Sequence, residues 1–229
     1  TLTNYGFIDY AKNLILSLEK CNFPLSLKIY CIDKKSFDEL TRWNKNIIVE
    51  MLDDETNTNE TIVGWKEPGW NTMVFSKIKC MYKELLNKSY VLFTDSDIVV
   101  DNNYSIQYLI DALKDYDMCD MCIQQNTQES KYPLNSGFIF MKSNEKMKNL
   151  FDWRKIDIEK FTCDQDYIND NKDKFNYYAL PRNLFPIEKD YYQQWLKPEP
   201  FNPYIIHFNY NVGKKKEIRI KKLNKWFLD

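Results

Sequence analysis

The chain has 229 residues, and its 32 lysines and arginines nearly balance its 33 aspartates and glutamates, for a formal net charge of −1. At roughly 150 residues per domain, this length predicts one large domain or two small ones. Hydrophobic residues make up 44% of the chain, which is enough for a substantial core and excludes a disordered chain. The balanced charge argues against nucleic acid as a partner, because nucleic-acid-binding proteins carry a strong basic excess.

Scarce residue types exclude further classes. The single histidine, His207, excludes multi-histidine metal sites and disfavours a histidine-based catalytic triad. The five glycines form neither a GxGxxG fingerprint nor a Walker loop, so bound phosphates need another kind of cradle. No stretch approaches the ~20 apolar residues of a membrane span. The chain begins at Thr1 rather than at a methionine, which leaves a preceding anchor segment open.

The six cysteines mostly lie within apolar runs, which predicts buried, reduced thiols and favours a reducing, cytoplasmic compartment. Cys119 and Cys122 form a lone CxxC. Without a second pair or a pair of histidines, this motif does not favour zinc or redox chemistry.

The first half alternates between helical and strand patterns. Apolar residues recur at helical spacing over 3–20, where Thr3 or Asn4 can cap the helix. The elements expected next are a strand at 27–32, a helix at 36–43, a strand at 47–51, a polar loop at 53–71, a helix around 78–85 and a strand at 90–94. This alternation predicts a mostly parallel sheet covered by helices.

The second half is less regular. Helices are expected at 105–114 and 144–153, strands at 118–123, 134–141 and 204–208, and a basic helix at the C-terminus. The long loop at 53–71 has the length of a lid or binding loop. Trp65 and Trp70 in it predict either a local hydrophobic clasp or a surface on which an acceptor stacks.

The most informative segment is the apolar run 90–94, which is followed directly by Asp95, Ser96 and Asp97. Carboxylates after a parallel strand lie in the crevice where open α/β sheets bind ligands. Two acidic groups so close repel each other unless a cation lies between them, and hard oxygen ligands select Mg²⁺ or Mn²⁺. A solvated turn is the alternative, but the apolar runs on both sides favour a metal site.

Two other interpretations of this motif have different outcomes. An EF-hand loop is excluded because Val99 and Val100 stand where it needs an oxygen ligand and a glycine. A haloacid-dehalogenase-type phosphatase using Asp95 and Asp97 remains the alternative enzyme. Such phosphatases normally carry the motif on their first strand, whereas several helices and strands precede it here.

Further motifs follow in a fixed order along the chain. They are TLTNYG at 1–6, Lys77 before the DSD motif, LNSGF at 134–138, DQDYIN at 164–169, Leu-Pro at 180–181, Phe-Pro at 185–186 and HFN at 207–209. This order resembles the nucleotide-diphospho-sugar transferases of the GT-A fold, close to glycosyltransferase family 77 and related to the glycogenin-type family 8. The resemblance spans nearly the whole chain.

The resemblance implies an α/β, GT-A-type (Rossmann-like) fold, with a mostly parallel central sheet flanked by helices in a single domain, 1–229. A nucleotide-binding half at about 1–100 would end in the DxD motif, and a sugar and acceptor half would follow at about 101–229. Asp95, Asp97 and His207 would bind Mn²⁺ or Mg²⁺, and Asp164, Gln165 and Asp166 would form the catalytic segment. The residues expected to bind the nucleotide and donor sugar are Thr3, Asn4, Tyr5, Lys77, Asp95, Ser96, Asn135, Ser136, Gly137, Gly213, Lys214 and Lys216.

Several of these residues also have ordinary structural explanations. Gly137 fits a bulged strand, although it would also let the backbone approach the sugar. The carboxylates at 164 and 166 fit the favourable end of a helix macrodipole. Any of the lysines at 214–216 could contact the diphosphate, and all three also fit a solvated helix. Tyr210 stands where the family often has tryptophan.

The sequence predicts a metal-dependent, retaining glycosyltransferase that moves a sugar from a nucleoside diphosphate, UDP above all, to a hydroxyl group of a saccharide or glycoprotein. The product would be α-linked. The alternatives are the phosphatase described above and a nucleotide-sugar-binding protein with a degenerate site.

Overall fold

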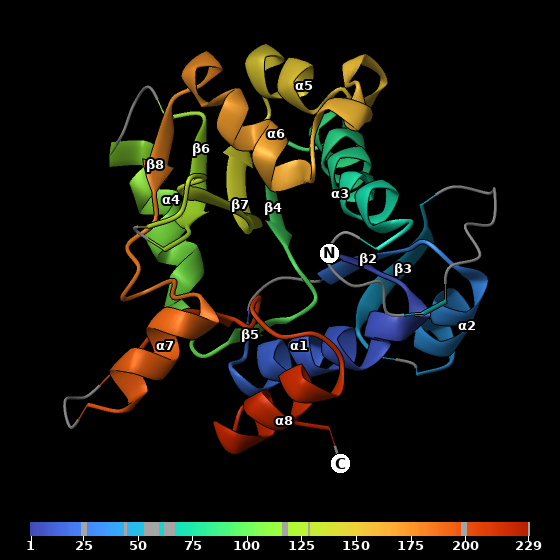
Figure 1. The fold of residues 1–229 in the computed structure, drawn as a ribbon, viewed down its shortest axis with the longest axis vertical. Coiled ribbons are helices and arrows are strands. Elements are labelled where there is room, and N and C mark those ends of the chain that lie inside the picture. The colour runs from blue at the N-terminus through green and yellow to red at the C-terminus, as the bar shows by residue number, and fades with distance from the viewer. Residues whose placement is uncertain are drawn as a thin grey trace.

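Strands and helices alternate along the chain in the computed structural model (Figure 1). The structure describes residues 1–23, 27–43, 45–52, 60–61, 67–115, 119–127, 129–197 and 201–228. The strands are β1 (Leu2–Thr3), β2 (Leu27–Cys31), β3 (Ile47–Met51), β4 (Tyr90–Thr94), β5 (Ile98–Val100), β6 (Met121–Gln125), β7 (Leu134–Lys142), β8 (Tyr177–Ala179) and β9 (Ile205–His207). The α-helices are α1 (Ile8–Lys20), α2 (Lys34–Trp43), α3 (Trp70–Leu85), α4 (Tyr104–Asp115), α5 (Glu145–Phe151), α6 (Asp164–Asp170), α7 (Glu188–Trp195) and α8 (Lys214–Lys222).

The N-terminal strands form a parallel sheet in the order β1-β2-β3, with Leu2 opposite Tyr30 and Leu27 opposite Ile47. Helices connect successive strands, as parallel pairing requires. The helix expected over 3–20 begins later than predicted, because Thr3 belongs to β1. Asn4 caps the 3-10 turn Tyr5–Phe7 by accepting a hydrogen bond from the Phe7 N–H, and α1 follows that turn.

The central sheet has the order β4-β7-β6-β8. β7 runs antiparallel to both β4 and β6, whereas β8 is parallel to β6. A short connection joins β6 to β7, and strands joined in this way pair antiparallel. The α/β class is confirmed. Parallel pairing holds throughout the N-terminal sheet, and reversal of β7 makes the central sheet mixed.

Side chains of the central strands alternate between two hydrophobic clusters, as the period of two in a strand requires. Val91 and Phe93 of β4 lie in the cluster beneath α3 and α5, whereas Leu92 faces the cluster beneath α4. β7 repeats this pattern, with Ile139 on the first face and Phe140 on the second. In Figure 1, α3, α5 and α6 lie together at one end of the molecule, and α1, α7 and α8 lie at the other.

An irregularity interrupts the pairing of β6 with β7. Ile123 lies opposite Ile139, but the next residue, Gln124, lies opposite Asn135. The intervening part of β7 therefore bulges out of the ladder, and bulges of this kind redirect side chains near functional sites. Within the bulge, the Gly137 carbonyl oxygen accepts a hydrogen bond of 2.7 Å from the Asp95 N–H, which joins the bulge to the end of β4.

Candidate functional site

The turn between β4 and β5 brings two carboxylates to the only histidine of the chain. β5 pairs antiparallel with β9 so that Ile98 lies opposite His207, and the Phe208 N–H donates to the Asp97 carbonyl oxygen at 3.1 Å. His207 Nε2 consequently lies 3.3 Å from Asp97 Oδ1 and 3.7 Å from Asp95 Oδ2. One ligand atom from each of these residues lies within 4.8 Å of the others. The structure thus gathers the three predicted metal ligands.

Two lysines, the half-buried Lys77 and the buried Lys216, flank this acidic cluster, which comprises Asp95, Asp97 and His207. Lys77 on α3 contacts both oxygens of Asp95, at 2.8 and 2.9 Å, and lies 3.6 Å from Asp164 Oδ2. Burial alone would lower the pKa of Lys77, but the Asp164 and Asp95 carboxylates raise it, so the side chain stays an ammonium.

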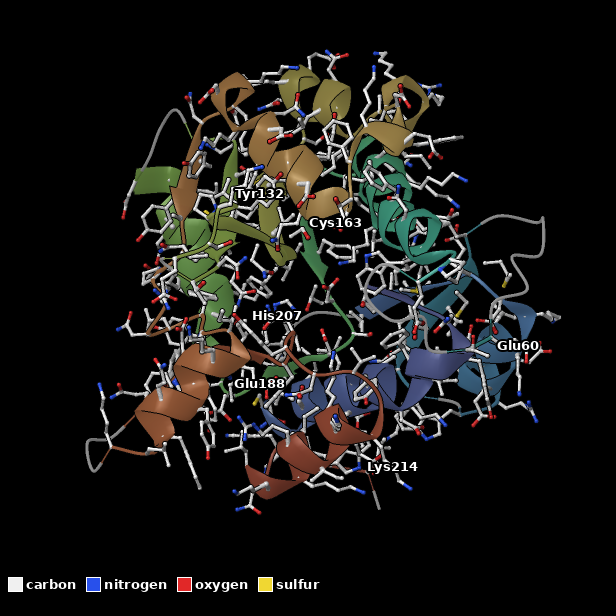
Figure 2. All side chains as sticks on the ribbon, in the orientation of Figure 1. Glu60, Tyr132, Cys163, Glu188, His207 and Lys214 are labelled. Carbon is white, nitrogen blue, oxygen red and sulfur yellow. The ribbon has the colours of Figure 1, made fainter. Side chains whose placement is uncertain are left out.

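Lys216 on α8 forms an ion pair with Asp97 from the other side. Burial would raise the pKa of Asp97, but the Lys216 ammonium above all, together with the contact from His207, holds it well below its usual range. Lys214 and Lys215 point to solvent, whereas Lys216 is only 4% exposed. Figure 2 shows His207 near the middle of the molecule and Lys214 with α8 at its lower end. Helix phase therefore selects Lys216 among the three consecutive lysines.

A cavity of about 630 Å³ opens above the acidic cluster. Most residues predicted to bind the donor or the metal line it, together with others that were not assigned to these roles. The predicted residues in the lining are Thr3, Asn4, Lys77, Asp95, Ser96, Asp97, Asn135, Ser136, Asp164, Gln165, His207 and Lys216. The others are Leu2, Phe7, Ile32, Trp70, Met73, Val74, Asn126, Cys163, Asn209, Tyr210, Asn211 and Val212.

Tyr5, Gly213 and Lys214 are not part of the described lining of this cavity. The Tyr5 ring packs against the cluster under α2, and Lys35 Nζ lies 3.8 Å from its ring centre. The Gly213 carbonyl oxygen accepts a hydrogen bond from the Tyr10 hydroxyl at 2.8 Å, which fixes the start of α8. The structure therefore gives Tyr5 and Gly213 structural contacts, and their direct contact with a donor stays a prediction.

The first turn of α6 contributes to the cavity unequally. Asp164 and Gln165 line the cavity, whereas Asp166 does not and accepts a hydrogen bond from the Cys163 thiol at 3.4 Å. Asp164 is 2% exposed, and its Oδ2 accepts no hydrogen bond within the described part of the chain. Burial raises the pKa of Asp164, although the nearby Lys77 opposes this shift. Asp164 is therefore the most enclosed of the three predicted catalytic residues.

Gly137 lies against the ring of His207. A Cβ atom placed on Gly137 would lie 2.1 Å from His207 Cε1 and 2.8 Å from both ring nitrogens. The missing side chain therefore makes room for the imidazole ring. Close approach of a donor sugar to Gly137 stays a prediction.

Sequence reasoning missed Gln124, which is fully buried at the end of β6. Its Oε1 lies 2.8 Å from His207 Nδ1. The only signal in the sequence was a pair of glutamines directly after an apolar strand, and a pair of this kind does not identify its partner. The bulge in β7 decides where this side chain points.

Trp70 lines the cavity while packing against the main hydrophobic cluster, so it has features of both roles considered for it. Trp65 lies outside the described residues. All six cysteines are free, and Cys119 and Cys122 are buried away from the cavity lining. Within the described ranges, no helix combines the length and apolar character needed to cross a bilayer.

The ligand atoms of the acidic cluster suit a divalent cation. Asp97 Oδ1 is buried and, among the described residues, has no hydrogen-bond partner, although it faces His207 Nε2. Two carboxylates and one imidazole form a mixed oxygen and nitrogen set, which is suited to Mn²⁺. The ammonium groups of Lys77 and Lys216 balance the charges of the two carboxylates.

The Asp-x-Asp turn, the late histidine and the cavity lie together at one edge of an α/β structure, where open α/β sheets bind ligands. Residues 26–222 match the nucleotide-diphospho-sugar transferase family, and the chain belongs to this family of glycosyltransferases.

A galactosyltransferase of similar sequence agrees with this assignment. The whole chain aligns at 26% identity with UDP-galactose:fucoside alpha-3-galactosyltransferase of Dictyostelium discoideum, and it spans 42% of the length of that relative.

Solved structures share the fold. The galactosyltransferase LgtC, in complex with donor and acceptor sugar analogues, superposes with a TM-score of 0.53 at 12% identity, covering 100% of this chain and 95% of LgtC. Mouse xyloside xylosyltransferase 1 gives a TM-score of 0.55 at 11% identity over 90% of this chain and 94% of the mouse protein. A glycosyltransferase involved in glycosylation of the major capsid of PBCV-1 gives 0.56 at 14% identity, over 95% and 93%.

Proposed function

We propose that this chain transfers a sugar from a UDP donor to a hydroxyl acceptor, with retention at the anomeric carbon and with a divalent cation, Mn²⁺ or Mg²⁺, as cofactor. The observation that carries the proposal is the acidic cluster of Asp95, Asp97 and His207 on the floor of the cavity, flanked by Lys77 and Lys216. Such a site can hold the diphosphate of a nucleotide sugar without a glycine-rich loop.

Asp95, Asp97 and His207 would hold Mn²⁺, which supplies Lewis-acid stabilisation of the charge on the leaving diphosphate. Lys216 places a second positive charge at the same point, because its ammonium pairs with Asp97. This ammonium can turn from the carboxylate to a phosphate oxygen. Lys77 stays between Asp95 and Asp164 and keeps these carboxylates compensated.

The part of the cavity wall formed by β7 and the start of α6 would orient the sugar. Asn135, Ser136, Asp164 and Gln165 present amide, hydroxyl and carboxylate groups there. We favour same-face transfer, in which a diphosphate oxygen takes the acceptor proton and Asp164 and Gln165 orient the sugar. A covalent route would instead use Asp164 as the nucleophile, since it is the enclosed carboxylate of this wall. Capture of a glycosyl-Asp164 adduct would establish that route.

The Dictyostelium relative acts by name on UDP-galactose and a fucoside. UDP-galactose is therefore the first donor to test with this chain, and α-fucosides are the first acceptors. Saccharides and glycoproteins with a terminal fucose extend the series.

The test is a transfer assay with purified protein, UDP-galactose and a fucoside, with and without Mn²⁺. We expect metal-dependent release of UDP together with an α-linked product, assigned by NMR. Asp97→Asn should lower kcat at least about 10²-fold, since it removes a group that acts on the transition-state charge. Asp101→Asn, which removes a carboxylate paired with Lys225, is the control and should leave kcat unchanged.

Three outcomes would contradict the proposal. UDP binding without transfer to any acceptor would identify a binding protein with a degenerate site. Release of inorganic phosphate from phosphomonoesters would identify the phosphatase alternative. A β-linked product would overturn retention.

A further inference from the structure

Gln124 contacts the histidine of the acidic cluster from the side opposite the carboxylates. Its side chain is fully buried, and Oε1 lies 2.8 Å from His207 Nδ1. Its amide nitrogen donates to two backbone carbonyl oxygens, that of Phe185 at 3.0 Å and that of Pro186 at 3.2 Å. Every polar atom of this side chain therefore has a partner.

These partners fix the orientation of the amide group. Carbonyl oxygens only accept hydrogen bonds, so the amide nitrogen must face Phe185 and Pro186. A flipped amide would place Oε1 against two other acceptors in a buried site, which costs the hydrogen bonds of all three groups. Oε1 therefore faces His207, and Oε1 also only accepts.

The orientation of the amide decides which ring nitrogen of His207 carries the proton. Nδ1 must donate to Gln124 Oε1, and in a neutral imidazole the other nitrogen then holds a free lone pair. That nitrogen, Nε2, is the one that faces Asp97 Oδ1 and Asp95 Oδ2. We propose that Gln124 is a positioning residue that holds His207 as the Nδ1–H tautomer and thereby directs the Nε2 lone pair at the cation position between the carboxylates.

Gly137 supports the same arrangement sterically. Its backbone lies against the imidazole, where a Cβ atom would overlap Cε1 of the ring. The His207 N–H also donates to the Pro186 carbonyl oxygen at 3.1 Å, so one short segment holds both the histidine backbone and Gln124. Histidines that bind metals usually donate their second N–H to a fixed acceptor, and loss of that acceptor weakens metal affinity about 10–100-fold.

The tautomer is tested without metal. His207 is the only histidine, so ¹⁵N-histidine labelling gives one pair of ring-nitrogen signals, and a long-range ¹H–¹⁵N spectrum shows which nitrogen carries the proton. In the metal-free protein, at a pH where titration of these signals shows a neutral ring, we expect a protonated Nδ1 and an unprotonated Nε2. An Nε2–H tautomer, or a mixture of both, in the unmodified protein overturns the proposal.

Three variants separate positioning from packing. Gln124→Leu keeps an apolar volume but removes the acceptor, and it should give a mixture of tautomers. Gln124→Glu keeps an oxygen that accepts from Nδ1–H, and its other oxygen, protonated, can still donate to one of the two carbonyl oxygens, so the Nδ1–H tautomer should persist. Gln125→Leu is the matched control, because Gln125 is the next residue of β6 and donates to the Leu180 carbonyl oxygen at 2.8 Å without contacting His207. A Gln124→Leu spectrum identical to that of the control overturns the proposal.

The consequence for the cation rests on the proposed function, and it has its own measurement. Electron paramagnetic resonance of free Mn²⁺ in the presence of UDP should show affinity weakened about 10–100-fold in Gln124→Leu and unchanged in Gln125→Leu. If the unmodified protein binds no Mn²⁺, the proposed function fails while the tautomer result stands or falls separately. If Mn²⁺ binds equally to both variants, the positioning role is wrong. Should Gln124→Leu not fold, the unmodified protein and Gln124→Glu still decide the tautomer.

Discussion

Two walls enclose the acidic cluster, and different forces hold them. The wall formed by α3, β4 and β7 belongs to the largest hydrophobic cluster, in which Ile78 and Met81 of α3 are buried within one turn of Lys77. The wall formed by β9, the loop 208–213 and α8 packs on a smaller cluster around Tyr10 and Phe208.

Polar contacts hold the second wall where apolar packing is thin. Buried Glu188 accepts hydrogen bonds from Asn211 at 2.7 Å and from Arg219 at 3.0 Å, and Lys216 pairs with Asp97. Apolar packing offers one arrangement, whereas ion pairs can exchange partners with a charged ligand. We therefore expect the α3 wall to fix the carboxylates and the α8 wall to respond to the donor.

Breaking the α8 wall at Lys216 should have the largest effect on stability. Lys216→Gln leaves the buried carboxylate of Asp97 without its partner, and loss of one member of a buried pair costs about 3–5 kcal/mol of unfolding free energy. Lys214→Gln is the matched control, because Lys214 is exposed on the same helix turn, and it should cost little. Denaturant unfolding without metal or nucleotide measures both. Equal free energies of unfolding for the two variants would show that the ion pair does not stabilise the fold.

Beside the α3 wall, where Asp164 of α6 lies 3.6 Å from Lys77, Asp164→Asn should separate stability from activity. Burial raises the pKa of Asp164, so the folded chain keeps this proton to a higher pH than the unfolded chain does. The free energy of unfolding should therefore fall as pH rises from the ordinary carboxyl range through the raised value. Asparagine removes that fall, and the variant should be more stable than the parent at neutral pH.

The same substitution should lower kcat by about 10²–10³, as expected when a hydrogen bond to the transition state is lost. Unfolding curves at several pH values and initial transfer rates check the two expectations. A variant that is less stable than its parent at neutral pH would show that Asp164 is held by favourable charge contacts. An unchanged kcat would remove Asp164 from the sugar site.

Glu188→Gln should give the smallest effect, and it sharpens the comparison of the walls. Glutamine keeps an acceptor for Asn211 and Arg219 but loses the charge, at a cost of about 1–2 kcal/mol. Because residues 209–212 of this loop line the cavity, KM for the donor should rise severalfold while kcat stays near the parent value. Glu217→Gln removes a surface pair with Lys221 and serves as the control. A fall in kcat without a change in KM would contradict this role.

The sequence was sufficient to predict those elements and site residues that follow from a local pattern. The place of Asp95 and Asp97 at the cavity could be predicted because they directly follow an apolar strand. Most helices and strands of the first half were predicted from their periodicity, but the short strands β1 and β5 were not, and α3 begins at Trp70, within the expected loop. The place of His207 beside these carboxylates could be predicted only because the motifs occur in the order of a known family. The reversal of β7 was not predicted, because an apolar run such as 134–141 carries no information about its direction.

Residues whose role depends on long-range geometry could not be predicted. Lys216 differs from Lys214 and Lys215 only in the phase of α8, which is set where Gly213 starts the helix. The roles of Gln124 and Gly137 arise from the bulge in β7, where pairing skips from Ile139 to Asn135. Both residues contact His207, which lies far away in the sequence, so no local pattern could reveal these contacts.

The most direct test of the central claim, that Asp95, Asp97 and His207 form a cation site for a nucleoside diphosphate, is calorimetric titration of UDP with and without Mn²⁺. In the unmodified protein, Mn²⁺ should tighten UDP binding at least about tenfold, which corresponds to 1.4 kcal/mol. Asp97→Asn and His207→Ala should abolish that gain while the control Asp101→Asn retains it. Equal affinity for UDP with and without Mn²⁺ in the unmodified protein, or a full metal response in Asp97→Asn and His207→Ala, would contradict the account.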